Sequence, residues 1–101
     1  DEEDVDNVHL DLDKFEAFTK GYLNIVKDML TNEEVETLVL GCITITIELG
    51  VRFLTDYLEG DKYFKINNYK HNLIRSRCQL ALVKDMLRKR KYMEEIVREY
   101  L

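Results

Sequence analysis

Apolar residues recur at helical spacing from about residue 13 to residue 29. The interval between them alternates between three and four residues, which is typical of one face of an amphipathic helix. This face consists of Phe15, Phe18, Tyr22, Ile25, Val26 and Met29. Asp13 and Glu16 have the spacing of a capping box and predict where the helix begins.

A second helix is predicted from about residue 32 to residue 59. Thr31 and Glu34 repeat the capping-box spacing, and Gly60 is suited to a left-handed cap at the other end. The segment 43–47 (ITITI) alternates like a strand, but the helical frame continues through it and no turn residue bounds it. Because this helix is apolar on most sides, we expect other helices to cover it. Gly41 and Gly50 would let neighbouring backbones approach closely.

A third helix is predicted from about residue 71 to residue 100, after a loop that contains Asn67 and Asn68. The apolar positions of this helix (Leu73, Leu80, Val83, Leu87, Ile96 and Tyr100), which we call its apolar stripe, become sparse at the basic cluster 88–91. The helix could bend or break there. The predicted fold class is all-α, with a single helical domain over residues 1–101 and an acidic leader at 1–10.

Composition supports a globular helical chain. Of the 101 residues, 46% are hydrophobic and none is proline, which favours long helices. We find no continuous apolar run of about 18 residues and therefore predict no membrane span. Cys42 and Cys78 are isolated, which fits a reduced, cytoplasmic compartment better than a disulfide framework, and neither is predicted to bind a metal ion.

Charge is unevenly distributed. Residues 1–61 contain 16 acidic and 4 basic residues, whereas residues 62–101 contain 4 acidic and 11 basic ones. The basic cluster 88–91 lacks interleaved aromatic residues and matches no nucleic-acid-binding motif. We therefore predict a solvated helix face, or pairing with the acidic half, and no nucleic-acid partner.

Arg52 interrupts the apolar second helix and is the centre of one candidate site. Glu48 and Asp56 lie four residues to either side, so a helix places all three side chains on one face. One interpretation is a structural clasp between helices, in which Glu48 and Asp56 supply ion pairs to Arg52. The other is a polar stripe that faces a ligand.

The chain shows no complete catalytic centre. Its sequence contains no Gly-rich phosphate loop and no recognisable Ser/His/Asp or Cys/His arrangement. We therefore predict no catalytic, cofactor-binding or metal-binding residues in these 101 residues.

Three segments carry a family resemblance that covers about residues 12–86. They are 15–23 (FEAFTKGYL), 48–64 (ELGVRFLTDYLEGDKYF) and 71–83 (HNLIRSRCQLALV). Together they resemble the C-terminal end of aminoglycoside-phosphotransferase-like kinases. The most similar branch is that of the N-acetylhexosamine 1-kinases, whose relatives are often named mucin desulfatases.

The resemblance implies a two-lobed, protein-kinase-like sugar kinase, of which this chain would be the helical end of the larger lobe. Arg52 and Tyr63 match family positions that contact the acceptor amino sugar. ATP and magnesium would bind to the missing N-terminal kinase portion, so this chain alone is expected to be an inactive C-terminal fragment. It would have no membrane partner.

The alternative is a non-enzymatic helical interaction or oligomerisation module. Its apolar faces would then bind a partner or a second copy of the chain. Under either hypothesis, surface normally covered by other parts of a protein would favour self-association.

Overall fold

The fold is all-α, as predicted. In the computed structural model, which describes residues 3–100, every regular element is a helix. The elements are η1 (Val5–Asn7), α1 (Leu12–Val26), η2 (Lys27–Met29), α2 (Asn32–Glu36), α3 (Leu38–Leu58) and α4 (His71–Glu99). The first two residues of the predicted acidic leader lie outside the described residues.

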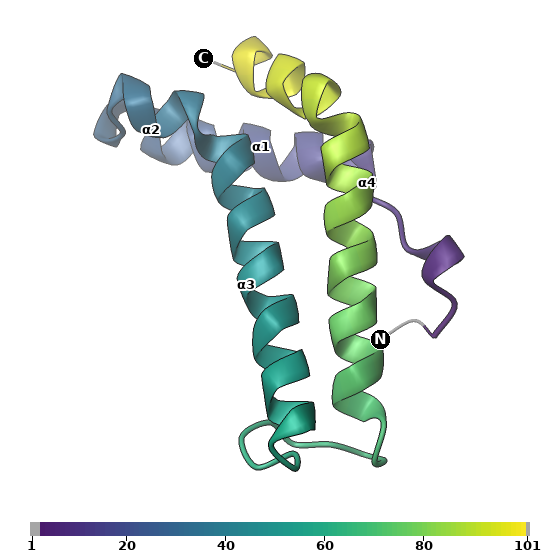
Figure 1. Cartoon of the computed structure of the whole chain (residues 1–101). Coiled ribbons are helices and arrows are strands. Elements are labelled where there is room, and N and C mark those ends of the chain that lie inside the picture. Colours follow the sequence, from purple (N-terminus) through teal and green to yellow (C-terminus); the bar gives the residue numbers. More distant parts are fainter. Residues whose placement is uncertain (1–2, 101) are drawn as a thin grey trace.

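Helices α3 and α4 form an antiparallel hairpin, and α1 crosses it at the end away from the α3–α4 loop (Figure 1). The last part of α4 bends over towards α2 and the start of α3, and the thinning of its apolar stripe had predicted a bend or break in this helix. The molecule measures 44 × 27 × 18 Å. Because a helix with its side chains is about 10 Å wide, this thin shape leaves room for a small core only.

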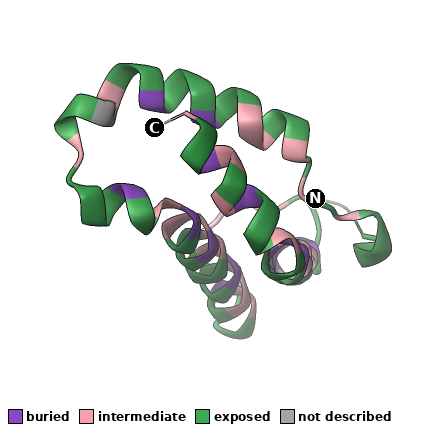
Figure 2. Cartoon of the chain, turned by 90° about the horizontal axis from the view of Figure 1, so that it is seen from above, coloured by how far each residue is buried: buried purple, intermediate pink, exposed green. Residues whose placement is uncertain are grey.

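That core lies where α1 and the bent end of α4 meet the start of α3. Leu23 and Met93 are fully buried within it. The other buried apolar side chains are Val35, Val39, Ile43, Val83, Met86 and Val97. Viewed from above, the buried positions follow the facing sides of the helices, while the outer sides are exposed (Figure 2).

The face that α1 buries agrees only in part with the predicted one, since Phe15 packs against the core. Phe18, Ile25 and Met29 are 64%, 78% and 78% exposed, whereas Thr19 and Leu23 are buried. Periodicity identified the helix correctly, but α1 is apolar on more than one side. It packs against the core through Leu12, Phe15 and Leu23, so only part of the predicted face is used. The exposed Phe18 and Tyr22 rings stack on each other at 5.8 Å.

The predicted second helix is divided at Thr37 into α2 and α3. The Thr37 hydroxyl donates to the carbonyl of Glu33 at 2.8 Å, and the backbone of Thr37 leaves the helical region at φ −101° and ψ 9°. The predicted capping box at Thr31 and Glu34 is confirmed, with both of its hydrogen bonds present.

Helix α3 is covered on one side only, which contradicts the prediction that other helices would surround it. Gly50 approaches the side chains of Gln79 and Leu80 on α4 closely, but Gly41 has open space around it, so only one of the two glycines is at a close contact.

Helix α3 is long and apolar enough to cross a membrane by length and composition, a property that the core helix of a soluble protein can share. Glu48 and Arg52 interrupt the continuous apolar run, so the predicted absence of a membrane span stays a prediction.

The start of α1 is capped by Asp11, not by the predicted Asp13. The Asp11 carboxylate accepts from the amides of Asp13 and Lys14 at 3.0 and 3.2 Å. An N-cap residue stands just before the first helical turn, and the helix begins at Leu12, one residue earlier than predicted.

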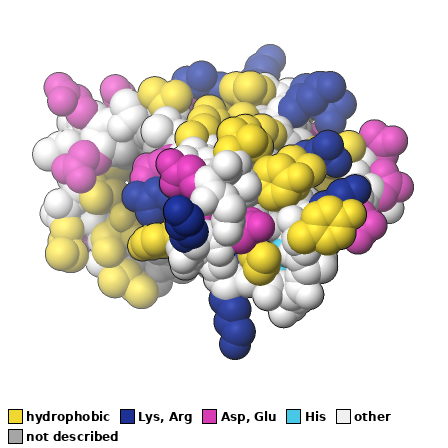
Figure 3. Space-filling view, turned by 60° about the horizontal axis from the view of Figure 1, so that its bottom comes forward, with side chains coloured by type: hydrophobic (Ala, Val, Ile, Leu, Met, Phe, Trp, Pro, Cys, Tyr) yellow, Lys and Arg dark blue, Asp and Glu magenta, His cyan; other side chains and the backbone are white. Residues whose placement is uncertain are grey.

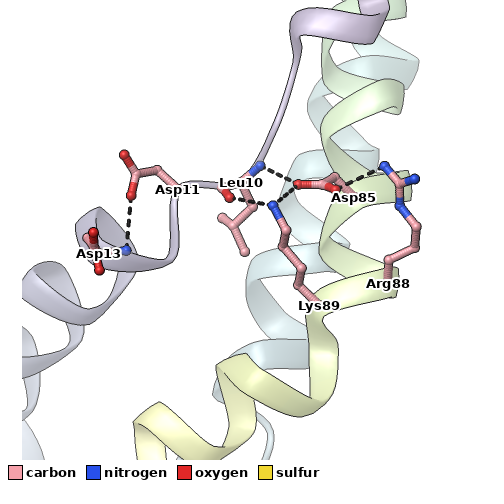
Figure 4. Close-up of polar contacts among 6 residues, drawn as sticks. All are labelled: Leu10, Asp11, Asp13, Asp85, Arg88 and Lys89. Carbon is pink, nitrogen blue, oxygen red and sulfur yellow. Dashed lines mark hydrogen bonds and ion pairs between the residues drawn. The ribbon is translucent and has the colours of Figure 1, made fainter.

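The segment before α1 is anchored to α4 by a buried carboxylate (Figure 4). Asp85 accepts from the Leu10 amide at 2.6 Å and from Lys89 at 2.7 Å, and it pairs with Arg88 at 2.9 Å. Burial raises the pKa of Asp85, but the bond from Lys89, the bond from the Leu10 amide and the charges of Lys89 and Arg88 outweigh it, so the pKa is lowered. The basic cluster therefore serves partly to hold the leader in place.

Arg90, a further member of the basic cluster, also pairs within α4. Arg90 binds Glu94 four residues later, at 2.9 Å. The predicted pairing with the acidic half of the chain is wrong for these ion pairs, because their carboxylates, Asp85 and Glu94, lie on α4 itself. Arg88 and Arg90 remain exposed, which agrees with the other alternative, a solvated helix face. The two cysteines are free and half-buried on different helices, as expected.

Candidate functional site: a hollow at the end of α3

The site is built where α3 ends and the chain turns back towards α4. Gly60 adopts φ +95°, which glycine tolerates without a side-chain clash, and Asp61 follows at φ +59°. The Asp61 amide then donates to the carbonyl of Asp56 at 2.7 Å, which closes the helix end. The predicted left-handed cap at Gly60 is confirmed.

Asp56 fixes the loop that follows. Its buried carboxylate accepts from the backbone amides of Tyr63 at 2.7 Å and Phe64 at 3.0 Å, and from the Asn72 side chain at 2.7 Å. Burial raises the pKa of Asp56, but these hydrogen bonds, with one from the Lys62 amide, outweigh it, so the pKa lies below its ordinary value. The carboxylate is therefore ionised at neutral pH and holds Tyr63 at a fixed place.

Residues in the first turns of α4 also hold the loop that follows α3. The fully buried Asn72 donates to both Asp56 and Asp61, and its carbonyl oxygen accepts from Arg75 at 3.1 Å. Arg75 also donates to the carbonyl of Lys65 at 2.9 Å. The loop is thus tied to the first turns of α4 at several points.

Contacts between aromatic rings also hold this loop against α3. Phe64 packs against Phe53 of α3 with ring centroids 4.6 Å apart, and Tyr63 meets the Phe64 ring edge-on at 4.9 Å. Tyr63 itself is 82% exposed. Its backbone is fixed while its ring and hydroxyl face solvent, which suits a residue that contacts a ligand.

Between α3 and this loop lies an open hollow of about 340 Å³. It is lined by Val51, Arg52, Thr55, Asp56, Glu59, Tyr63 and Phe64. In the view that brings the loop end forward, hydrophobic side chains gather on the surface with basic side chains around them (Figure 3). An apolar floor with a few polar groups is typical of small-molecule sites.

Arg52 is a surface residue rather than part of a buried clasp. It pairs with Glu48 at 2.9 Å, and both side chains are largely exposed, at 62% and 58%. The predicted Glu48 ion pair is therefore present, but it lies within α3 and joins no second helix.

The predicted pairing of Arg52 with Asp56 is wrong. The Asp56 side chain turns inward to the loop amides and Asn72, and within the described chain it makes no ion pair with Arg52. The physical reason is that loop amides and an amide side chain satisfy a buried carboxylate without the cost of burying Arg52.

The structure brings Arg52 and Tyr63 together at the hollow, as the acceptor-site prediction requires. Four further lining residues were not predicted: Val51, Thr55, Glu59 and Phe64. Thr55 and Glu59 lie three and seven residues after Arg52, so helical spacing from Arg52 could have found them, whereas Val51 directly precedes it. Phe64 depends on the path of the loop, which the sequence does not reveal.

The hollow offers hydrogen-bonding groups but no assembled catalytic group. In residues 3–100 no three His, Cys, Asp or Glu side chains come together as they would to hold a metal ion. The arrangement can bind and orient a small polar molecule through Arg52, Thr55, Glu59 and the Tyr63 hydroxyl. A scan against models of known protein families finds no match for this chain.

Proposed function

We propose that this chain is the C-terminal helical part of an ATP-dependent phosphotransferase that acts on an amino sugar of the N-acetylhexosamine type. Arg52 and Tyr63 would contact the acceptor sugar. The observation that supports this role best is that the two residues, one on α3 and one in the following loop, line the same hollow.

The chemistry of the hollow suits a sugar. A guanidinium presents several donors in a fixed plane to hydroxyl or amide oxygens. The exposed Tyr63 ring offers a flat apolar face, and its hydroxyl can donate or accept. Because Asp56 and Phe64 fix the backbone and ring environment of Tyr63, little ordering would be needed on binding.

ATP and magnesium would bind to the other part of such an enzyme, in the cytoplasm. The lining of the hollow supplies no set of carboxylates suited to a metal ion, and we assign no step in these residues to one. Without the nucleotide-binding portion the chain would bind the acceptor but transfer no phosphoryl group.

A non-enzymatic interaction module is the second candidate. The observation that favours it is the number of large apolar side chains exposed on α1, η2 and α3, among them Ile25, Met29 and Leu58 at 78%, 78% and 74%. Exposed apolar side chains, where they adjoin one another, mark contact surfaces on many proteins.

Acceptor binding is tested by an NMR titration of the isotopically labelled chain with N-acetylglucosamine and N-acetylgalactosamine, with glucose as the comparison sugar. We expect the amide signals of residues 51–64 to shift with an N-acetylhexosamine. Arg52→Ala should abolish the shifts. Arg90→Ala is the matched control, because Arg90 makes the same four-residue ion pair at 2.9 Å away from the hollow.

Shifts confined to the loop and lost only in Arg52→Ala would support the sugar site. Shifts that survive in Arg52→Ala, or their absence at high sugar concentration, would count against Arg52 as an acceptor contact and favour the interaction module.

A further inference from the structure

Helix α3 carries an exposed apolar stripe beside its buried face. At 100° per residue, the buried Val39, Ile43 and Gly50 lie about 60–100° around the helix from this stripe. We call Leu40, Ile47, Val51 and Leu58 the α3 stripe; they are 45%, 40%, 52% and 74% exposed. At 100° per residue these four positions fall within a narrow sector of the helix surface. The stripe is about 27 Å long at 1.5 Å per residue.

The intervals between the residues of the α3 stripe are the same whether they are counted from its N-terminal or its C-terminal end. Its members are separated by seven, four and seven residues. A second α3 helix laid antiparallel along the stripe, with a two-fold axis at the level of Leu49, would place Leu40 opposite Leu58 and Ile47 opposite Val51. Such a surface is complementary to itself, which is the requirement for a two-fold symmetric contact.

The charges beside the stripe are also complementary to themselves. Glu48 and Arg52 lie along one flank, exposed and paired within the helix. In the antiparallel arrangement Glu48 of one copy and Arg52 of the other would lie about 3 Å apart along the axis. The two Glu48 carboxylates would approach each other, and an arginine from each copy would neutralise them.

We propose that a second copy of this chain packs antiparallel on the α3 stripe to form a two-fold symmetric dimer. A second copy explains both the reversed spacing and the alternating charges on the flank. A lipid bilayer would explain neither, and it would leave Glu48 and Arg52 in an apolar medium at mid-helix.

The dimer goes beyond the proposed sugar site, although the two surfaces share Val51, which also lines the hollow. The dimer is therefore tested at Ile47, which lies outside the lining of the hollow. Failure of the dimer would leave the sugar titration unaffected.

The test is sedimentation of the whole 101-residue chain over a wide range of concentrations. We expect a monomer–dimer equilibrium and an about tenfold or larger rise in the dissociation constant for Ile47→Lys. Ile45→Lys is the matched control, because Ile45 is an exposed isoleucine, at 67%, on another side of the same helix. Circular dichroism would establish that both variants fold.

The proposal is overturned by a wild-type chain that remains monomeric, by a dimer that Ile47→Lys leaves intact, or by an open-ended series of larger species. Equal weakening by Ile45→Lys and Ile47→Lys would also overturn it, because the contact would then not be specific to the stripe.

Orientation is tested by disulfide formation between copies in which Cys42 and Cys78 are replaced by serine. A mixture of Leu40→Cys and Leu58→Cys chains should form a mixed disulfide dimer, while each variant alone should not. Cross-linking of Leu40→Cys to itself would indicate parallel helices and overturn the antiparallel arrangement.

Discussion

Replacement of Arg52 by alanine distinguishes a ligand-facing residue from a structural one. Arg52 is 62% exposed and contacts Glu48, which is 58% exposed, four residues earlier on the same helix. Exposed pairs at this spacing contribute about 0.3–0.5 kcal/mol, because water screens the charges and two long side chains must be ordered. Alanine also favours the helix slightly more than arginine does.

We therefore expect Arg52→Ala to lower the free energy of unfolding by no more than about 0.5 kcal/mol. For a domain of this size, such a loss corresponds to a fall in Tm of less than about 4 °C. Thermal unfolding followed by far-UV circular dichroism measures it. Arg90→Ala should give a similar small change, since its pair with Glu94 has the same spacing and distance.

A structural clasp would give a different result. Breaking a buried ion pair costs about 3–5 kcal/mol, which would lower Tm by roughly 12 °C or more. A fall of that size in Arg52→Ala, with Arg90→Ala nearly unchanged, would refute the conclusion that Arg52 is free to contact a ligand.

Further predictions concern the core, the glycines and pH. Leu23→Ala should lower the free energy of unfolding in urea by about 2–5 kcal/mol, because Leu23 is fully buried. Ile25→Ala, at a residue that is 78% exposed, should change it by less than about 0.5 kcal/mol. Gly41→Ala should stabilise the protein by about 0.5–1 kcal/mol, and Gly50→Ala should raise Tm less, because only at Gly50 does a new Cβ meet α4 side chains at 3.3 Å. Asp85 has a lowered pKa, so its contribution to stability is present above its ordinary pKa and is lost as pH falls through the folded value. Urea unfolding of Asp85→Asn should therefore show a deficit at neutral pH that shrinks below about pH 4; a deficit independent of pH would contradict this.

The helices could be predicted from the sequence because their spacing and caps agree. The Thr31 capping box and Gly60 mark helix ends in the structure as they do in the sequence. The face that each helix buries could not be predicted in the same way. Helices α1 and α3 are apolar on more than one side, and only packing decides that Leu23 is buried while Phe18 is exposed.

The sequence pointed to two residues that line the hollow, and their role as ligand contacts stays a prediction. Arg52 was identified from its place in the apolar helix and from the family resemblance, and Tyr63 from the resemblance alone. The role of Asp56 was missed because its partners are backbone amides of a loop seven and eight residues later. Helical spacing instead predicted that Asp56 would form an ion pair with Arg52. The anchoring of Leu10 by Asp85 was missed for the same reason, since the two are 75 residues apart.

The central claim is that this chain supplies the acceptor site of an amino-sugar kinase. It is tested most directly by phosphoryl transfer from ATP to N-acetylhexosamines in the presence of magnesium, using the polypeptide as it is translated in its native source. We predict transfer by the wild type and by Arg90→Ala, and loss of transfer in Arg52→Ala with Tm almost unchanged. Full activity in Arg52→Ala, or no transfer to any amino sugar by the wild type, would contradict the claim.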